Sequence, residues 1–155
     1  MNTDAEFSED DKRIETRDWG GRVAPACRLW NANLHPLSVP IAQAETSNDQ
    51  FDNKVKFSPD GSRALRPNDG DVELLDLKGE RIAKLADDKN KKWVSSRFSP
   101  NGKFVLTKTN EAGYLWDANG RLVGHPMKSL GGADHFKFSD GGRQLRSIDR
   151  ATGNI

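Results

Sequence analysis

Three histidines and one cysteine are the residues of this sequence that most often act as metal ligands or nucleophiles. His35, His125 and His135 are isolated from one another and have no cysteine or carboxylate at the spacing of a metal site. The single cysteine, Cys27, excludes an internal disulfide and suits a small buried strand residue in a reducing compartment. The motifs of serine hydrolases, zinc peptidases and nucleotide-binding loops are absent. We therefore expect a protein that is not an enzyme and has no catalytic residue, cofactor or metal.

A charged cluster at residues 87–92 is the strongest candidate for contact with a partner. It reads Asp-Asp-Lys-Asn-Lys-Lys and is followed directly by Trp93. Because tryptophan supplies much of the binding energy at protein interfaces, an exposed Trp93 would be an anchor. Two alternatives remain, an ordinary solvated loop at 87–92 and a Trp93 packed between strands. With three residues from similar positions of the repeats described below, the candidate partner-binding set is Arg66, Lys89, Lys91, Lys92, Trp93, Lys108 and Arg146.

The balance of charge argues against nucleic acid and membrane partners. Lysine and arginine number 24 against 23 acidic residues, so the net charge is only +1 and local patches must select the partner. Residues 1–6 are acidic and no apolar run follows them, unlike a secretory signal, and the sequence has no apolar stretch long enough to span a bilayer. We expect a cytoplasmic protein that binds other proteins.

The elements that carry these residues follow from a repeat of about 40 residues. Copies of one pentapeptide read Phe-Ser-Pro-Asp-Gly at 57–61, Phe-Ser-Pro-Asn-Gly at 98–102 and Phe-Ser-Asp-Gly-Gly at 138–142. A weaker copy, Phe-Ser-Glu-Asp-Asp, lies at 7–11. The pentapeptides predict turns, because proline presets φ and glycine accepts a positive φ.

A second motif follows each of the first three pentapeptides. It reads Leu-Trp-Asn at 29–31, Leu-Leu-Asp at 74–76 and Leu-Trp-Asp at 115–117. Further turn formers lie between and after the two motifs, and every apolar segment is short. Three turns per unit predict four antiparallel strands, and no segment has a sustained helical period.

The two motifs in register resemble the WD-repeat (tryptophan-aspartate repeat) β-propeller family, in a degenerate form like that of bacterial members. The resemblance covers about residues 7–155 and implies that Trp30 and Trp116 are buried between neighbouring blades. In the family, a histidine from a Gly-His pair joins a hydrogen-bonded network with a strand hydroxyl and the indole. Here Gly124-His125 is the only such pair and a proline follows it. The hydroxyl position, nine residues beyond each phenylalanine, holds Thr16, Arg66, Thr107 and Ser147.

The predicted fold is all-β, a partial β-propeller of about three four-stranded antiparallel blades. We expect one array whose units lie approximately at 7–50, 51–91, 92–133 and 134–155, the last incomplete. Because closed propellers need about 4–8 blades, the array should be open, with blade edges available for self-association. A fragment, a truncated gene product and a subunit that completes a ring by oligomerising all remain open.

The expected function is a non-enzymatic protein–protein interaction or scaffolding module, in which rigid blades hold variable loops that select the partner. The alternative is an accessory regulatory propeller of a multidomain enzyme, a signalling ATPase or hydrolase, whose catalytic part lies outside this chain. The sequence names neither the partner nor the face that binds it.

Overall fold

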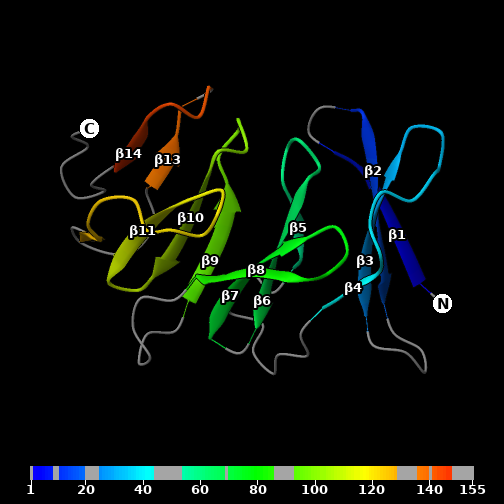
Figure 1. Ribbon diagram of the computed structural model, residues 1–155, viewed down its shortest axis with the longest axis horizontal. Helices are drawn as coiled ribbons and strands as arrows, with labels where there is room; N and C mark the ends of the chain where they lie inside the picture. The colour runs from blue at the N-terminus through cyan, green and yellow to red at the C-terminus, as the bar shows by residue number, and fades with distance from the viewer. Residues whose placement is uncertain are drawn as a thin grey trace.

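The computed structural model describes residues 2–8, 11–19, 25–43, 54–68, 70–85, 93–128, 136–139 and 141–147. These residues form β-strands and turns, with no helix among them. Three four-stranded antiparallel sheets and one two-stranded sheet follow one another along the chain (Figure 1). In every sheet the strands pair in chain order, which is the meander predicted from the turn signals.

We name the sheets blades 1 to 4. Blade 1 contains β1 (Asn2–Phe7), β2 (Arg13–Trp19), β3 (Ala26–Asn31) and β4 (Ile41–Ala42). Blade 2 contains β5 (Lys56–Phe57), β6 (Arg63–Asn68), β7 (Asp71–Asp76) and β8 (Arg81–Leu85). Blade 3 contains β9 (Trp93–Phe98), β10 (Phe104–Thr109), β11 (Ala112–Asp117) and β12 (Met127–Lys128). The described part of blade 4 contains β13 (Phe136–Phe138) and β14 (Leu145–Ser147).

The phenylalanine-serine motif closes the first strand of each blade and forms the turn into the second. In blade 2 the Ser58 hydroxyl accepts the amide of Arg63 at 3.0 Å, while the Gly61 amide donates to the Ser58 carbonyl at 2.8 Å. The same pair of bonds forms at Ser99 in blade 3 and at Ser139 in blade 4. Gly61 has a φ of +67°, which explains the glycine at this position.

Blade 1 forms the same turn from the weakest copy of the motif. Ser8 accepts the amide of Arg13 at 3.1 Å, and Asp11 takes the glycine position with a φ of +55°. Aspartate tolerates the left-handed region better than most residues, so the turn survives the substitution. The Phe7 copy is therefore a structural member of the repeat.

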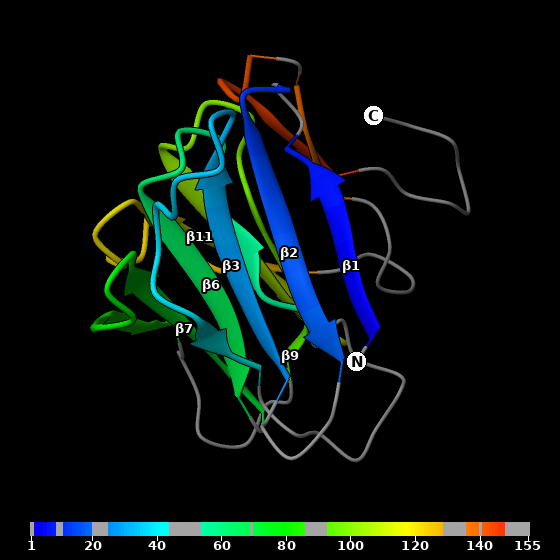
Figure 2. The same ribbon diagram turned by 90° about the vertical axis from the view of Figure 1, so that its right-hand side faces the viewer.

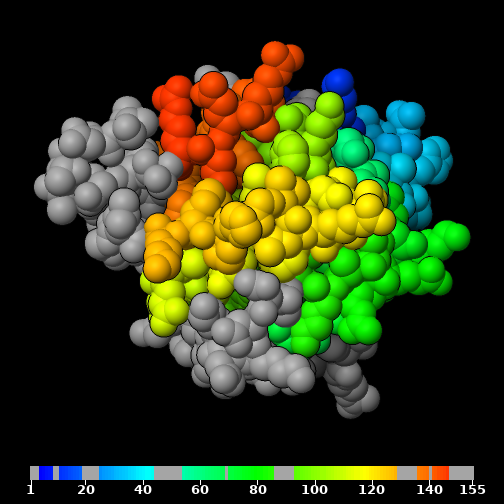
Figure 3. Space-filling view, turned by 60° about the vertical axis from the view of Figure 1, so that its left-hand side comes forward, coloured from blue at the N-terminus to red at the C-terminus, as the bar shows by residue number. Residues whose placement is uncertain are grey.

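The blades are stacked side by side and share apolar cores (Figures 1 and 2). One cluster joins blades 1 and 2 and consists of Cys27, Leu29, Ile41, Val55, Phe57, Ala64 and Leu75. A second joins blades 2 and 3 and consists of Leu65, Val72, Leu74, Leu85, Trp93, Val105, Ala112, Tyr114 and Trp116. Blade 4 continues the stack, since a Cβ on Gly113 of blade 3 would lie 2.8 Å from the ring of Phe136. Figure 3 shows the yellow outer part of blade 3 between green blade 2 and the orange strands of blade 4.

This arrangement is a partial β-propeller, as the repeat predicts. Three of its blades are four-stranded meanders, two strands of the fourth are described, and the described sheets do not close into a ring. The phenylalanine that ends each first strand shows the effect of stacking. Phe57, which packs against blade 1, is 9% exposed, whereas Phe7 lies on a face of blade 1 that no described blade covers and is 69% exposed.

Candidate binding site

The first strands of three successive blades line a cavity of about 410 Å³. Its walls are the closing phenylalanines Phe57, Phe98 and Phe138 and the basic residues immediately before them, Lys56, Arg97 and Lys137, together with Pro59, Ser99 and Pro100. We call it the first-strand cavity. Its volume lies in the range of small-ligand sites, and its lining combines aromatic rings with three cations.

The two-residue period of a strand explains why a cation and a ring alternate here. Successive side chains point to opposite faces of a sheet. In blade 2, Phe57 therefore packs against blade 1, while Lys56 faces blade 3. Blades 2 and 3 thus each direct a phenylalanine backward and a basic residue forward along the stack.

Two of the cations bind the backbone of the following blade. The Lys56 ammonium donates to the carbonyl of Ser96, and the Arg97 guanidinium donates to the carbonyl of Phe136. In both cases the acceptor lies two residues before the phenylalanine of the next blade. These bonds fix the two basic side chains in the wall of the cavity.

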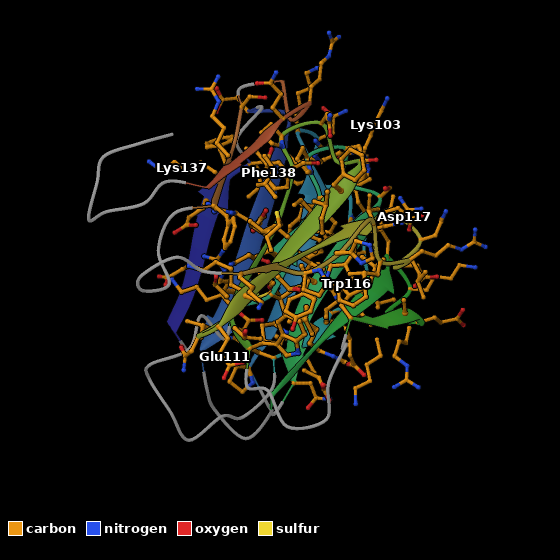
Figure 4. The ribbon with its side chains drawn as sticks, turned by 90° about the vertical axis from the view of Figure 1, so that its left-hand side faces the viewer. Lys103, Glu111, Trp116, Asp117, Lys137 and Phe138 are labelled. Atoms are coloured by element: carbon orange, nitrogen blue, oxygen red, sulfur yellow. The ribbon has the colours of Figure 1, made fainter. Side chains whose placement is uncertain are left out.

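Lys137 holds the same register position in blade 4 but has a different environment. Its side chain is exposed, and its ammonium makes no hydrogen bond or ion pair with the residues described. Arg146 is its cross-strand neighbour in β14. Figure 4 shows Lys137 directed away from Lys103, which lies on the other side of the molecule in that view.

The electrostatics of the cavity favour an anion. Among the residues that the structure describes, no aspartate or glutamate belongs to its lining. The register position carries an acid only in blade 1, where Glu6 is paired with Arg17 at 3.0 Å. Partial burial lowers the pKa of Arg97 from its ordinary value, because the charged guanidinium has lost part of its hydration. A cavity lined by charges of one sign concentrates the opposite charge.

The residues predicted from sequence occupy several different places. Arg66 is bound through two nitrogens to Glu73, at 2.9 and 2.6 Å, and does not point freely to solvent. Lys108 is buried in β10, and Arg146 is exposed beside Lys137. Lys89, Lys91 and Lys92 lie outside the described residues. Among the described members of the set, Arg146 is the cross-strand neighbour of a residue of the first-strand cavity, Lys137.

Trp93 is a core residue, which was one of the two alternatives left by the sequence. It is 6% exposed and makes edge contacts with Tyr114 and Trp116, with ring centroids 5.0 and 6.5 Å apart. The alternative prediction, an exposed Trp93 that anchors a partner, is therefore wrong.

The two motif tryptophans differ in burial. Trp116 is 5% exposed and lies between blades 2 and 3 as expected. Trp30 is only half-buried, because its face of blade 1 has no described blade against it, and Arg28 lies over its ring at 5.2 Å. The expectation of full burial for Trp30 is corrected.

Sequence reasoning missed the cations of the cavity, although a signal was present. A basic residue precedes the motif phenylalanine in three of the four copies, at Lys56, Arg97 and Lys137. The alternation of strand side chains would have placed all three on the same side of their blades.

The part of the chain that the structure covers contains no cluster of three or more histidine, cysteine, aspartate or glutamate residues that could hold a metal ion. It also contains no helix with the length and apolar character needed to cross a membrane.

Comparison with known proteins supports the fold alone. No family model and no curated protein matches the chain. A crystal structure of a eukaryotic initiation factor superposes with a TM-score of 0.52 and 16% identity, over 81% of this chain and 32% of that one. KlHsv2 with loop 6CD replaced by a Gly-Ser linker superposes with a TM-score of 0.60 and 13% identity, over 94% of this chain and 46% of that one. This chain thus spans less than half the length of either structure.

Proposed function

We propose that this chain is a non-enzymatic protein-interaction module of the WD-repeat type, which holds a partner at the first-strand cavity. The observation that carries the proposal is the cavity itself, about 410 Å³ in volume and built by the first strands of three blades. A site on strands is held more firmly than one on loops, so it offers a partner a preorganised surface. The cytoplasm is the proposed location.

Two repeated structural features support the WD-repeat assignment. The indole of Trp116 donates to the Thr107 hydroxyl at 2.7 Å, and that of Trp30 donates to Thr16 at 2.9 Å. The tryptophan and hydroxyl of the family network are thus paired in blades 1 and 3.

The last residue of the Leu-Trp-Asp motif supplies the second feature. Asp117 accepts the amides of Asn119 and Arg121 at 2.8 and 2.9 Å and so shapes the turn after the third strand. Asp76 and Asn31 accept the corresponding pairs of amides in blades 2 and 1. The recurrence of this bonding agrees with the motif's place in WD units.

The lining of the cavity suits the binding of a partner. The described lining contains amines, a guanidinium, aromatic rings, two prolines and a serine. Such a surface can attract and desolvate an anionic partner group.

Site-specific photo-crosslinking tests the proposal. A photoreactive phenylalanine analogue replaces Phe138 in the cavity or, as a control, Phe7, which holds the same register position in blade 1. We expect one defined protein to crosslink at position 138 and not at 7, and to bind the purified chain in fixed stoichiometry. Equal labelling of the same proteins from both positions, or none at 138, would refute a binding role for the cavity.

A further inference from the structure

We infer that the first-strand cavity recognises an acidic peptide segment, with carboxylates of the segment at Lys137 and Arg97 and an apolar side chain against the phenylalanine rings. This inference rests on the proposed function, because it names the chemistry that the same cavity would select in a protein partner.

Basic side chains recur at one register position in successive blades. Lys56, Arg97 and Lys137 hold one register position in three consecutive blades, so three cations line one cavity of about 410 Å³. Among the residues of the lining that the structure describes, none is an aspartate or a glutamate. Basic side chains gathered in one hollow repel one another and attract an anion.

The basic groups of the lining keep a positive charge that a ligand carboxylate can meet. Lys56 and Arg97 are held by backbone carbonyls of the next blade, but a carbonyl is neutral and leaves their charge in place. Lys137 is exposed and has no hydrogen-bond or ion-pair partner within the described residues. Its ammonium can therefore turn toward a carboxylate without breaking a described bond, while Arg97 supplies a second positive charge in the same lining.

Apolar side chains also border the cavity. Phe98 and Phe138 are half-buried, Pro100 is exposed, and all three border the cavity. These surfaces favour a ligand with apolar groups next to its charge, since removing apolar surface from water is favourable. A peptide that combines acidic and apolar side chains satisfies both halves of the site, whereas a small inorganic anion satisfies only one.

Nucleic acid fits the same surface less well. Phosphate-backbone binding depends on extended tracks of lysine and arginine, and the chain's net charge is only +1. The three cations are confined to one cavity and are interleaved with phenylalanines. A short anionic segment of a protein is the better match.

Fluorescence anisotropy with a labelled ten-residue peptide of glutamate, aspartate, leucine and phenylalanine tests the inference. The comparison peptide has glutamine and asparagine in place of the acids. We expect the acidic peptide to bind saturably and to weaken as salt is added, and the amide peptide to bind at least about tenfold more weakly, a difference of about 1.4 kcal/mol. Equal affinity for both peptides would overturn the inference.

Variants of the intact chain locate the binding. Lys137→Glu should raise the Kd of the acidic peptide about tenfold or more. Lys137→Arg, which keeps the positive charge, should leave the Kd close to that of the parent chain. Lys103→Glu, an equal change of charge at an exposed turn residue outside the lining, should change the Kd less than about twofold, as exposed charges contribute little. Circular dichroism checks that the variants stay folded.

The controls separate this inference from the proposed function. A single-stranded oligonucleotide of the same net charge should not displace the peptide at equal concentration, and displacement would contradict a peptide ligand. If a crosslinked partner binds at position 138 but Lys137→Glu leaves its affinity unchanged, the acidic-segment inference fails while the binding module stands. If no partner binds there at all, the proposed function fails.

Discussion

The indole nitrogen of Trp116 donates a hydrogen bond to the hydroxyl of Thr107 across adjacent strands of blade 3, at 2.7 Å. Both residues are buried, so the bond satisfies a donor that has no access to water. Blade 2 has Leu75 in the tryptophan position, which needs no acceptor, and there the hydroxyl position holds Arg66, paired with Glu73. The two positions thus change together between blades.

Removal of the Thr107 hydroxyl should destabilise the protein. Thr107→Val keeps the shape of the side chain but leaves the buried indole N–H without an acceptor, which costs about 1–3 kcal/mol. Thr16→Val should cost less, because Trp30 is half-buried and water can replace the acceptor. Denaturant unfolding of both variants measures the difference, and a larger loss for Thr16→Val would contradict the burial of the two tryptophans.

Replacement of Leu34 by glycine should stabilise the protein. Leu34 has a φ of +61° at the position where the other two blades have Gly79 and Gly120, and its side chain is 66% exposed. A left-handed conformation costs an ordinary residue about 1–2 kcal/mol, so Leu34→Gly should raise the free energy of unfolding by about 1 kcal/mol after the extra freedom of the unfolded glycine is counted. The reciprocal change, Gly79→Leu, should destabilise it. Thermal unfolding of both variants checks the pair.

The turn at Asp117 should make stability depend on pH at the acid end. The amide of Arg121, and to a lesser degree that of Asn119, holds the pKa of the Asp117 carboxyl below its usual range. A lowered pKa in the folded state stabilises the protein above the pKa of the unfolded chain, near 3.9, and this stabilisation disappears as the pH falls through the folded-state value.

Asp117→Asn tests this dependence, since Asn31 shapes the equivalent turn in blade 1 without a charge. The variant should differ from the parent by a constant amount above about pH 5, and the difference should shrink below about pH 4. Urea unfolding across this range measures it. A difference that grows toward low pH would have the wrong sign for a lowered pKa.

Loss of one partner of the Arg66–Glu73 ion pair should lower the stability of the protein more than loss of both partners. Glu73 is 6% exposed and also bonds Arg81 at 3.3 Å. Arg66→Thr should destabilise more than the double variant Arg66→Thr/Glu73→Gln, because the single change leaves a buried carboxylate with Arg81 as its one remaining described ion-pair partner. A double-mutant cycle in denaturant gives the coupling, and simple additivity would argue against the pair.

The sequence predicted the features that depend on local chemistry. The pentapeptide turns and the four-strand meander follow from turn residues and from spacing along the chain. Even the copy at Phe7, which lacks proline and glycine, forms its turn, because Ser8 keeps the essential hydrogen bonds and Asp11 accepts a positive φ.

Features that depend on contacts with neighbouring blades could not be predicted from the sequence in this way. Trp93 is buried because Tyr114 and Trp116 lie against it, and Trp30 is half-exposed because its face lacks a described blade. Arg66 is paired because Glu73 is its cross-strand neighbour, a register that the sequence pattern leaves open. The cavity requires three blades at once, so no single repeat reveals it.

Mapping the acidic peptide by nuclear magnetic resonance tests the central claim most directly. With an isotope-labelled chain, saturating peptide should shift the backbone amide signals of Lys56, Phe57, Arg97, Phe98, Lys137 and Phe138 more than those of the turn at 117–121. The shifts should titrate with one Kd that matches the anisotropy value. Saturable binding whose shifts cluster elsewhere, with the first-strand signals unmoved, would contradict the assignment of the first-strand cavity as the binding site.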